Sequence, residues 1–140
     1  MLALRLVLDT NILVSAALKP ASLQRTTFLL ALTKPARLYV SPAILAEYRD
    51  VLSRPELRIS KGSRLQLLQL VRNRSHLVNP LRRLEVCPDP DGNRFLEAAD
   101  KSGADYLITG NLRHFPAFWK KTKIVSSREF ISLAAPHLLG

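Results

Sequence analysis

The sequence is short of cysteine, of long apolar runs and of acidic residues. Its 140 residues include one cysteine, Cys87, which excludes an internal disulfide and a cysteine-based metal cage. The longest apolar runs are well below the roughly 20 residues that span a membrane. A strand-like stretch followed by Asp9 stands where a signal peptide would have its cleavage site. These absences predict a cytoplasmic protein with no membrane segment.

Acidic residues are outnumbered by basic ones, with 11 Asp and Glu against 21 Lys and Arg and a formal net charge of +10 at pH 7. Such an excess favours a polyanionic partner, because each phosphate that a protein neutralises releases bound counterions. RNA, DNA and an acidic protein all qualify, and a charge that serves only solubility is the alternative. The basic residues are spread along the chain, which is typical of a folded surface rather than a basic tail.

Apolar residues are plentiful, at 47% of the sequence, and the length suits one domain over residues 1–140 with a core of its own. Short apolar runs alternate with stretches of helical periodicity, without repeats or long linkers. We expect strands at 6–8 (extended by 1–4), 38–40, 104–109 and 123–125. We expect helices at 12–18, 23–32, 43–53 and 61–74, one from Asn93, and a last one capped by Ser126 with Glu129. This alternation predicts an α/β fold with a mostly parallel sheet.

The first expected strand ends at Asp9-Thr-Asn11, three residues that compete for backbone hydrogen bonds. Asn11 is a candidate cap for the helix that follows. Asp9 thus places a carboxylate at the C-terminal tip of a strand, the edge at which ligands bind in open α/β sheets. The alternative is that Asp9 only caps the helix.

Glu47 lies at the edge of the apolar stripe of its helix, one turn from both Ile44 and Val51. We therefore expect it to point toward the sheet, where a carboxylate needs a partner to offset its desolvation. A metal ion shared with Asp9 is one such partner. A salt bridge to one of the many arginines is the other.

Polar residues also gather at Asp89-Pro-Asp-Gly-Asn93 and at the end of the strand over 104–109. The first group is a turn whose Asp and Asn side chains can cap the helix from Asn93, a role that explains one aspartate better than two. Gly110-Asn111 ends its strand as Asp9 ends the first. Polar groups at the tips of parallel strands converge on one end of the sheet.

Four blocks, in this order, resemble the PIN domain family. They are Asp9-Thr-Asn11 after a strand, Ser41-Pro42 with Glu47 on the next helix, the stretch from Asp89 to Glu97, and the strand that runs from Ala104 to Asn111. Together they cover residues 4–116. More closely, they are similar to the toxins of type II toxin–antitoxin pairs, the VapC-type ribonucleases. The resemblance implies a small α/β/α sandwich with a mostly parallel sheet, an antitoxin partner, and an acidic cluster that binds Mg²⁺ or Mn²⁺ to hydrolyse RNA.

Carried over position by position, the resemblance makes Asp9, Glu47 and Asp91 the catalytic acids and metal ligands. It places Asn111 at the fourth catalytic position, where many relatives have an aspartate.

The same carry-over gives Asn11 and Thr109 supporting positions. Relatives often have a further acid where this chain has Gly92, so Asp89 or Asn93 is a candidate to share the role of the third acid. Glu97, one turn into the helix, is a less suitable substitute.

Phosphodiester hydrolysis needs an activated water, charge stabilisation at the phosphoryl group and help for the leaving oxygen, and hard cations held by carboxylates supply all three. We expect one firmly held ion, with a second only alongside the substrate phosphate. Arg94 and Arg113 are candidates to bind the substrate. His114 is expected in a surface turn. The wide apolar face of the helix over 61–74 leaves room for a homodimer or an antitoxin-like contact.

Two other functions stay open. A phosphatase-like enzyme with Asp9 as nucleophile would favour a second acid two residues on, where Asn11 stands. A catalytically degenerate RNA- or protein-binding module is the other, because Asn111 and Gly92 thin the acidic cluster.

Overall fold

The computed structural model describes residues 3–140, in which six strands form one sheet in the order β3-β2-β1-β4-β6-β5. The strands are β1 (Arg5–Leu8), β2 (Arg37–Val40), β3 (His76–Leu77), β4 (Tyr106–Ile108), β5 (Phe118–Trp119) and β6 (Thr122–Val125). All neighbouring strands pair in parallel except β5, which runs antiparallel to β6. The predicted α/β class with a mostly parallel sheet is confirmed.

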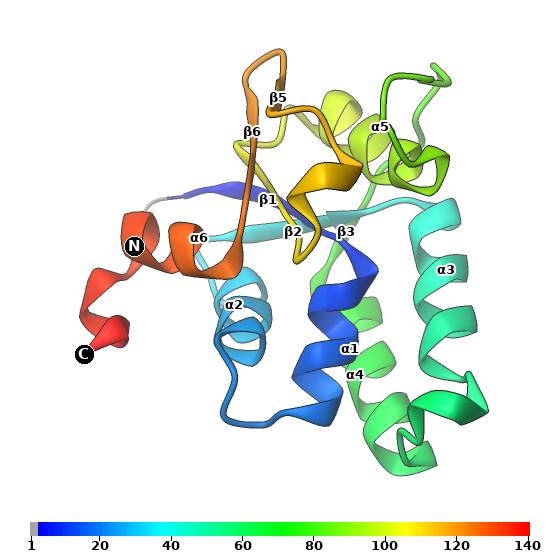
Figure 1. The fold of residues 1–140 in the computed structure, drawn as a ribbon, viewed down its shortest axis with the longest axis vertical. Coiled ribbons are helices and arrows are strands. Elements are labelled where there is room, and N and C mark those ends of the chain that lie inside the picture. The colour runs from blue at the N-terminus through cyan, green and yellow to red at the C-terminus, as the bar shows by residue number, and fades with distance from the viewer. Residues whose placement is uncertain (1–2) are drawn as a thin grey trace.

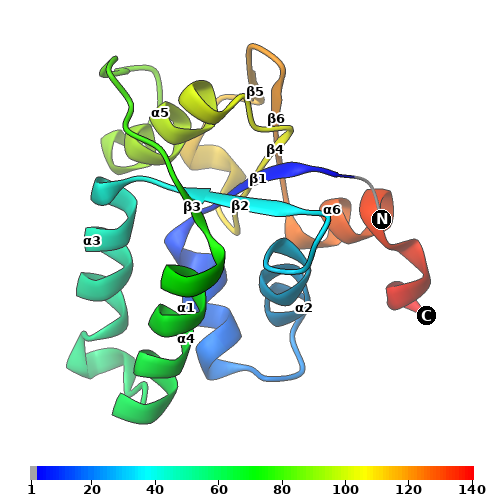
Figure 2. The ribbon, with the colours of Figure 1, turned by 180° about the vertical axis from the view of Figure 1, so that it is seen from behind.

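Helices cover both faces of this sheet, as an α/β/α sandwich requires. They are α1 (Thr10–Leu18), α2 (Leu23–Ala31), α3 (Pro42–Leu52), α4 (Lys61–Arg74), α5 (Asn93–Ser102) and α6 (Ser127–Ala134). Short 3₁₀ turns lie at Pro55–Leu57, Pro90–Gly92, Leu112–His114 and Pro136–Leu139. Figures 1 and 2 show α5 on one face of the sheet and the other helices on the opposite face.

The order of the strands explains why α5 stands apart. From β1 through β2 to β3 the chain moves one way across the sheet, and from β3 to β4 it returns to the other side of β1. Because parallel crossovers are almost always right-handed, reversing the direction of travel puts the connecting helix on the opposite face. As a result α3 and the turn before α5 approach the same edge of the sheet from its two faces.

The central strand β1 carries the core. Leu6, Val7 and Leu8 have no exposed surface, so both faces of the strand are covered. This is why an unbroken apolar run, rather than an alternating one, marks it in the sequence. The largest fully buried side chains around it include Tyr48, Phe28 and Phe95.

Several predicted boundaries are corrected by the structure. Helix α1 begins at Thr10, two residues early, and its cap is Asp9, so the expectation that Asn11 caps it is wrong. Strand β1 begins at Arg5, without Leu4, while residues 1–2 lie outside the described residues. Strand β4 occupies three of the six expected residues. Strands β3 and β5 were not predicted, because two residues carry no periodicity.

Serine side chains cap α2, α3 and α6, the last as predicted, but the expectation that an Asp or Asn side chain caps α5 is wrong, because its N-cap is Gly92. The Ser22 and Ser41 hydroxyls accept the backbone N–H groups three residues on, at 3.1 and 3.2 Å. Ser126 and Glu129 form a capping box at the start of α6. Within residues 3–140, no helix combines the length and the apolar character needed to cross a membrane.

Candidate active site

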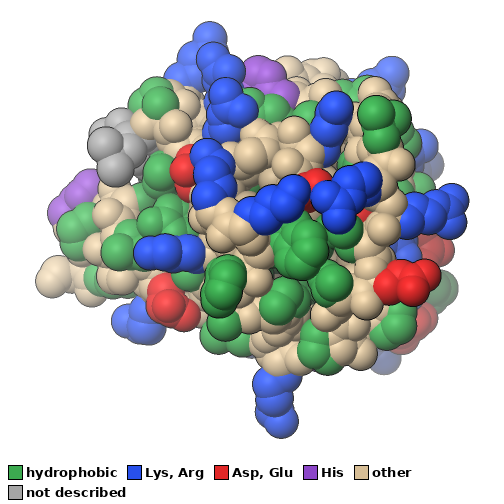
Figure 3. Space-filling model, turned by 90° about the horizontal axis from the view of Figure 1, so that it is seen from above, with side chains coloured by type: hydrophobic (Ala, Val, Ile, Leu, Met, Phe, Trp, Pro, Cys, Tyr) green, Lys and Arg blue, Asp and Glu red, His purple; other side chains and the backbone are tan. Residues whose placement is uncertain are grey.

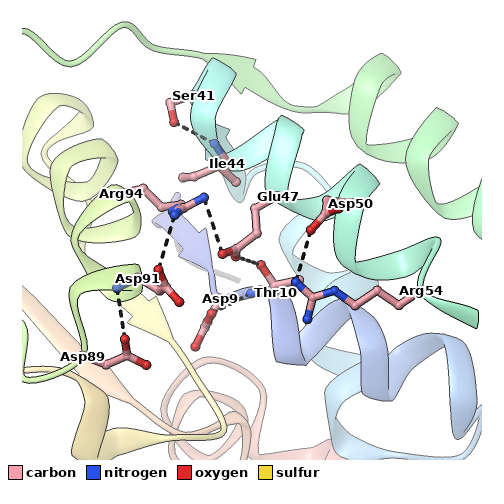
Figure 4. A network of polar contacts seen from close by, with 10 residues as sticks. All are labelled: Asp9, Thr10, Ser41, Ile44, Glu47, Asp50, Arg54, Asp89, Asp91 and Arg94. Atoms are coloured by element: carbon pink, nitrogen blue, oxygen red, sulfur yellow. Dashed lines mark hydrogen bonds and ion pairs between the residues drawn. The ribbon is translucent and has the colours of Figure 1, made fainter. Parts of the chain in front are cut away.

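The carboxyl edge of the sheet gathers polar side chains from four separate parts of the chain. Asp9 follows β1, Glu47 lies on α3, Asp91 lies in the turn before α5, and Thr109 follows β4. Figure 4 shows Asp9, Glu47 and Asp91 facing one another from three elements. The predicted convergence of these three carboxylates on one edge is therefore found.

Asp9 is held by two hydrogen bonds. Its Oδ1 accepts the Thr10 backbone N–H at 2.7 Å, and its Oδ2 accepts the Thr109 hydroxyl at 2.7 Å. Burial raises the pKa of Asp9 above its ordinary value of 3.8 and the nearby Glu47 carboxylate raises it further, although the two hydrogen bonds oppose this shift. Asp9 thus does cap α1, yet its charge is incompletely compensated in the folded protein.

Glu47 points inward from α3, with 16% of its side chain exposed. Its Oε2 accepts a hydrogen bond from the Thr10 hydroxyl, which joins α3 to the first turn of α1. Thr10 was given no role from the sequence, although it lies between two predicted site residues. Its burial, at 5% exposed, is the property that the local sequence does not reveal.

Arg94 stands between two of the predicted metal ligands. Its Nη1 lies 3.5 Å from Glu47 Oε1 and its Nη2 lies 3.7 Å from Asp91 Oδ1, as Figure 4 shows. The sequence left open whether Glu47 meets a metal or an arginine, and here it meets an arginine of α5. The guanidinium thus supplies positive charge at a point where two carboxylates face each other.

A small cavity of about 50 Å³ opens between the carboxylates at this edge of the sheet. It is bordered by side chains from both faces of the sheet: Asp9, Glu47, Asp89, Asp91, His114 and Phe115. His114 lies at the surface, as expected, but its Nδ1 also approaches Asp89 Oδ2 at 3.3 Å. Asp89 in turn accepts the Asp91 backbone N–H at 3.0 Å, so it shapes the turn that carries Asp91.

Gly92 packs closely against Phe115 and Cys87. A Cβ at this position would lie 3.0 Å from Phe115 Cε1 and 3.4 Å from the Cys87 sulfur. The Phe115 ring therefore occupies the space that a further acid would need.

Burial also raises the pKa of Cys87 to about 11, so its thiol stays protonated and unreactive at neutral pH.

Asn11 links the first turn of α1 to the end of β4, and Thr109 shapes the turn that follows β4. Asn11 Oδ1 accepts the Gly110 backbone N–H at 3.1 Å, and Thr109 Oγ1 accepts the Asn111 backbone N–H at 2.9 Å. The side chain of Asn111 itself is exposed, as is that of Arg113 two residues on. The structure brings Asn111 to the expected edge but not to the lining of the small cavity.

Two of the candidates for the third acid bind the backbone of the preceding loop instead. Asn93 Oδ1 accepts the Cys87 N–H at 3.0 Å, and Glu97 Oε2 accepts the Leu84 N–H at 2.8 Å. Neither side chain borders the cavity that holds Asp9 and Glu47. Asp91 reaches that cavity, although 80% of its side chain is exposed.

The donor set fits a hard divalent cation in part. Asp9 and Glu47 offer carboxylate oxygens, which Mg²⁺ and Mn²⁺ prefer, and a bound cation would offset the burial that raises the pKa of Asp9. Across residues 3–140, however, no three His, Cys, Asp or Glu side chains converge closely enough to hold a metal ion. Arg94 lies between Glu47 and Asp91, so this edge is arranged around a guanidinium.

The comparisons with known proteins agree with this architecture. A sequence profile of the PIN domain matches residues 5–113. An uncharacterized protein of Methanocaldococcus jannaschii is 31% identical over 111 residues, which are 77% of this chain and 71% of that protein.

Among solved structures, a chain of VapBC2 from Rickettsia felis, crystallised with a DNA fragment from its promoter, has the same fold. The TM-score is 0.58 at 16% identity, over 87% of this chain and 98% of that one. The profile spans most of the sequence, including Asp9, Glu47 and Asp91, and therefore shows that the chain belongs to the PIN-domain family.

Proposed function

We propose that this protein is a divalent-metal-dependent endoribonuclease that acts in the cytoplasm as the toxin of a toxin–antitoxin pair. PIN domains are in general nucleases that use divalent metal ions, which supports the hydrolase class. The observation that carries the proposal is the meeting of Asp9, directly after β1, and Glu47, on α3, at a cavity on the carboxyl edge of the sheet.

Asp9 and Glu47 would hold the ion, Mg²⁺ or Mn²⁺, and Asp91 would become the third protein ligand by turning its side chain, which is 80% exposed, toward them. The ion would supply Lewis acidity and an activated water for attack on the RNA phosphodiester. Thr109 and Thr10 orient the two inner carboxylates through their hydroxyl groups. Because Asp9 is fixed at the start of α1 and Glu47 on α3, the distance between their carboxylates is set by the fold and not by flexible side chains.

The charge of the protein suits an RNA substrate. Lys and Arg side chains are spread over the face that Figure 3 shows. Arg94 and Arg113, near the acidic centre, are the proposed contacts to phosphate. A basic surface draws in a polyanion from a distance, while the cation would neutralise the acids at the centre.

The toxin role is supported by the fold shared with a chain of Rickettsia felis VapBC2. An antitoxin or a second copy of the chain would have an apolar surface available on α4, where 51% of Leu65 is exposed although the helix packs Leu67 and Val71 into the core.

The proposal is tested by incubating a mixed single-stranded RNA pool with the purified protein in Mg²⁺, in Mn²⁺ and in EDTA. We expect cleavage only with metal, and a loss of at least roughly 100-fold in Asp9→Asn, since a metal ligand contributes several kcal/mol to such a transition state. Asp50→Asn is the matched control, because this aspartate lies on the exposed surface of α3 with 70% of its side chain accessible.

A second function has its own support. The guanidinium of Arg94 between Glu47 and Asp91, and the Phe115 ring against Gly92, fit a PIN fold that binds RNA or protein without cutting. RNA binding that persists with no cleavage in either metal would establish this module and refute the nuclease.

A further inference from the structure

The opposite edge of the sheet holds a second and much larger concavity. It is an open cleft of about 1090 Å³, formed where β1 and β2 begin, where α2 leads into β2, and where α4 ends before β3. We call it the basic cleft, because its charged lining residues are Arg5, Lys34, Arg37 and Arg74, with His76 beside them. No carboxylate lines it among the described residues.

Two of these cations are forced together by the sheet itself. Arg5 and Arg37 are register partners on the parallel strands β1 and β2. Neighbouring strands lie only about 4.8 Å apart, and like charges placed opposite each other destabilise a sheet. Within residues 3–140, no ion pair involves the side chain of Arg5, Lys34, Arg37 or Arg74. The cleft therefore concentrates positive charge that no ion pair of these four side chains neutralises.

Arg5 is also fixed in place. Its Nη1 donates to the Ser102 carbonyl oxygen at 2.9 Å, and its guanidinium carbon lies 5.9 Å from the centre of the Tyr39 ring. Tyr39 in turn packs on the His76 ring at 5.5 Å between centroids. Lys34, Arg37 and Arg74 have exposed side chains around this fixed group. One held arginine and three adaptable cations suit a ligand that carries several negative charges.

The size of the cleft and the chemistry of its cations narrow the ligand further. A small-molecule site usually encloses its ligand in about 300–1,000 Å³ and places only a few polar groups around it, whereas this cleft is open and has four cations among its lining residues. Three of its four cations are arginines, whose planar guanidinium matches phosphate in two parallel hydrogen bonds. Repeated charges along a groove match a phosphodiester chain better than one isolated phosphate.

We propose that the basic cleft binds the phosphodiester backbone of an RNA strand, as an anchoring site separate from the acidic centre. The choice of RNA rests on the proposed function. The anchoring itself does not require the metal, because Asp9, Glu47 and Asp91 lie at the other end of the strands. Such a site would hold one part of the RNA on the protein while another part of the same RNA reaches the acidic edge.

The test is fluorescence anisotropy of a labelled single-stranded RNA in EDTA, where no metal-dependent cleavage occurs, between 50 and 200 mM salt. Four phosphate contacts give a slope of log affinity against log salt concentration of about −2.8. The affinity for RNA then falls roughly 50-fold between the two salt concentrations. In the double variant Arg37→Gln/Arg74→Gln, the slope should become shallower by about 1.4, so that the cleft contributes only about a 7-fold loss.

Lys19→Gln/Lys61→Gln is the matched control, with the same change in net charge. These two exposed lysines lie at the ends of α1 and α4 that point away from the sheet in Figure 1. Their salt slope should equal that of the wild type. An equal change in both double variants, or a change in neither, would overturn the proposal, since binding would then be diffuse or located elsewhere.

Two further measurements complete the design. Thermal unfolding checks that the cleft variant folds, and if it does not, Lys34→Gln/Arg74→Gln replaces it with two exposed side chains. Displacement of the RNA by poly-aspartate as effectively as by unlabelled RNA, charge for charge, would assign the cleft to an acidic protein and overturn the proposal. If the cleft variant shows the expected shallower salt slope but the protein cleaves no RNA in metal, the nuclease alone is refuted. If the protein cleaves RNA but the cleft variant keeps the salt slope of the wild type, the cleft proposal alone is refuted.

Discussion

Replacing Arg94 should tighten the binding of a divalent cation at the acidic edge. In the folded protein the Arg94 guanidinium lies 3.5 Å from Glu47 and 3.7 Å from Asp91, the two groups proposed to share the ion with Asp9. A cation that binds both carboxylates must first displace this guanidinium. Arg94→Gln removes the competing charge while it keeps much of the length of the side chain.

The size of the effect follows from the distance and the exposure of the pair. Two unit charges 3.5 Å apart attract by about 1.2 kcal/mol in bulk water and by about 4.7 kcal/mol at an effective dielectric constant of 20. A third of the Arg94 side chain is exposed, so the lower figure applies, at roughly 1 kcal/mol. The dissociation constant for Mn²⁺ should therefore fall about fivefold.

Isothermal titration calorimetry with Mn²⁺ measures this constant without RNA or cleavage. Arg49→Gln is the control, since it makes the same change of charge on an exposed side chain two residues from Glu47, on the same helix. An affinity that is unchanged or weaker in Arg94→Gln, or equally raised in Arg49→Gln, would refute the view that Arg94 competes with the ion.

Two further predictions concern stability. The Tyr48 hydroxyl is buried and donates to the Leu8 carbonyl oxygen at 2.5 Å. Tyr48→Phe should thus lower the free energy of unfolding by about 1–2 kcal/mol and the melting temperature by several degrees in thermal circular dichroism, and an unchanged melting temperature would contradict this role. The hydrogen bond from Lys120, at 2.8 Å, is the main cause that lowers the pKa of Asp100 below its ordinary value of 3.8. Because a lowered carboxyl pKa stabilises the fold only while the group is ionised, Asp100→Asn should cost roughly 0.5–1 kcal/mol at pH 7. In urea unfolding at a series of pH values, this difference should close as the pH falls below 3.8, and a difference that persists there would refute the electrostatic cause.

Features that depend on near neighbours in the chain are predictable from the amino-acid sequence. The unbroken apolar run of Leu6, Val7 and Leu8 marks the buried central strand, since a strand covered on both faces needs no alternation. Ser41 and Ser126 mark helix starts, because their hydroxyls bond to N–H groups three residues away. The positions of Asp9 and Glu47 on one edge also follow from local order, once the strands are taken as parallel.

The partners of these acids, in contrast, depend on the tertiary fold. Asp9 accepts a hydrogen bond from Thr109, 100 residues away, and Glu47 pairs with Arg94 of α5 rather than with an arginine of its own helix. The Phe115 ring fills the space beside Gly92. No periodicity or spacing encodes these contacts, because they depend on β4 lying beside β1 and on α5 crossing to the opposite face of the sheet, where its first turn meets α3.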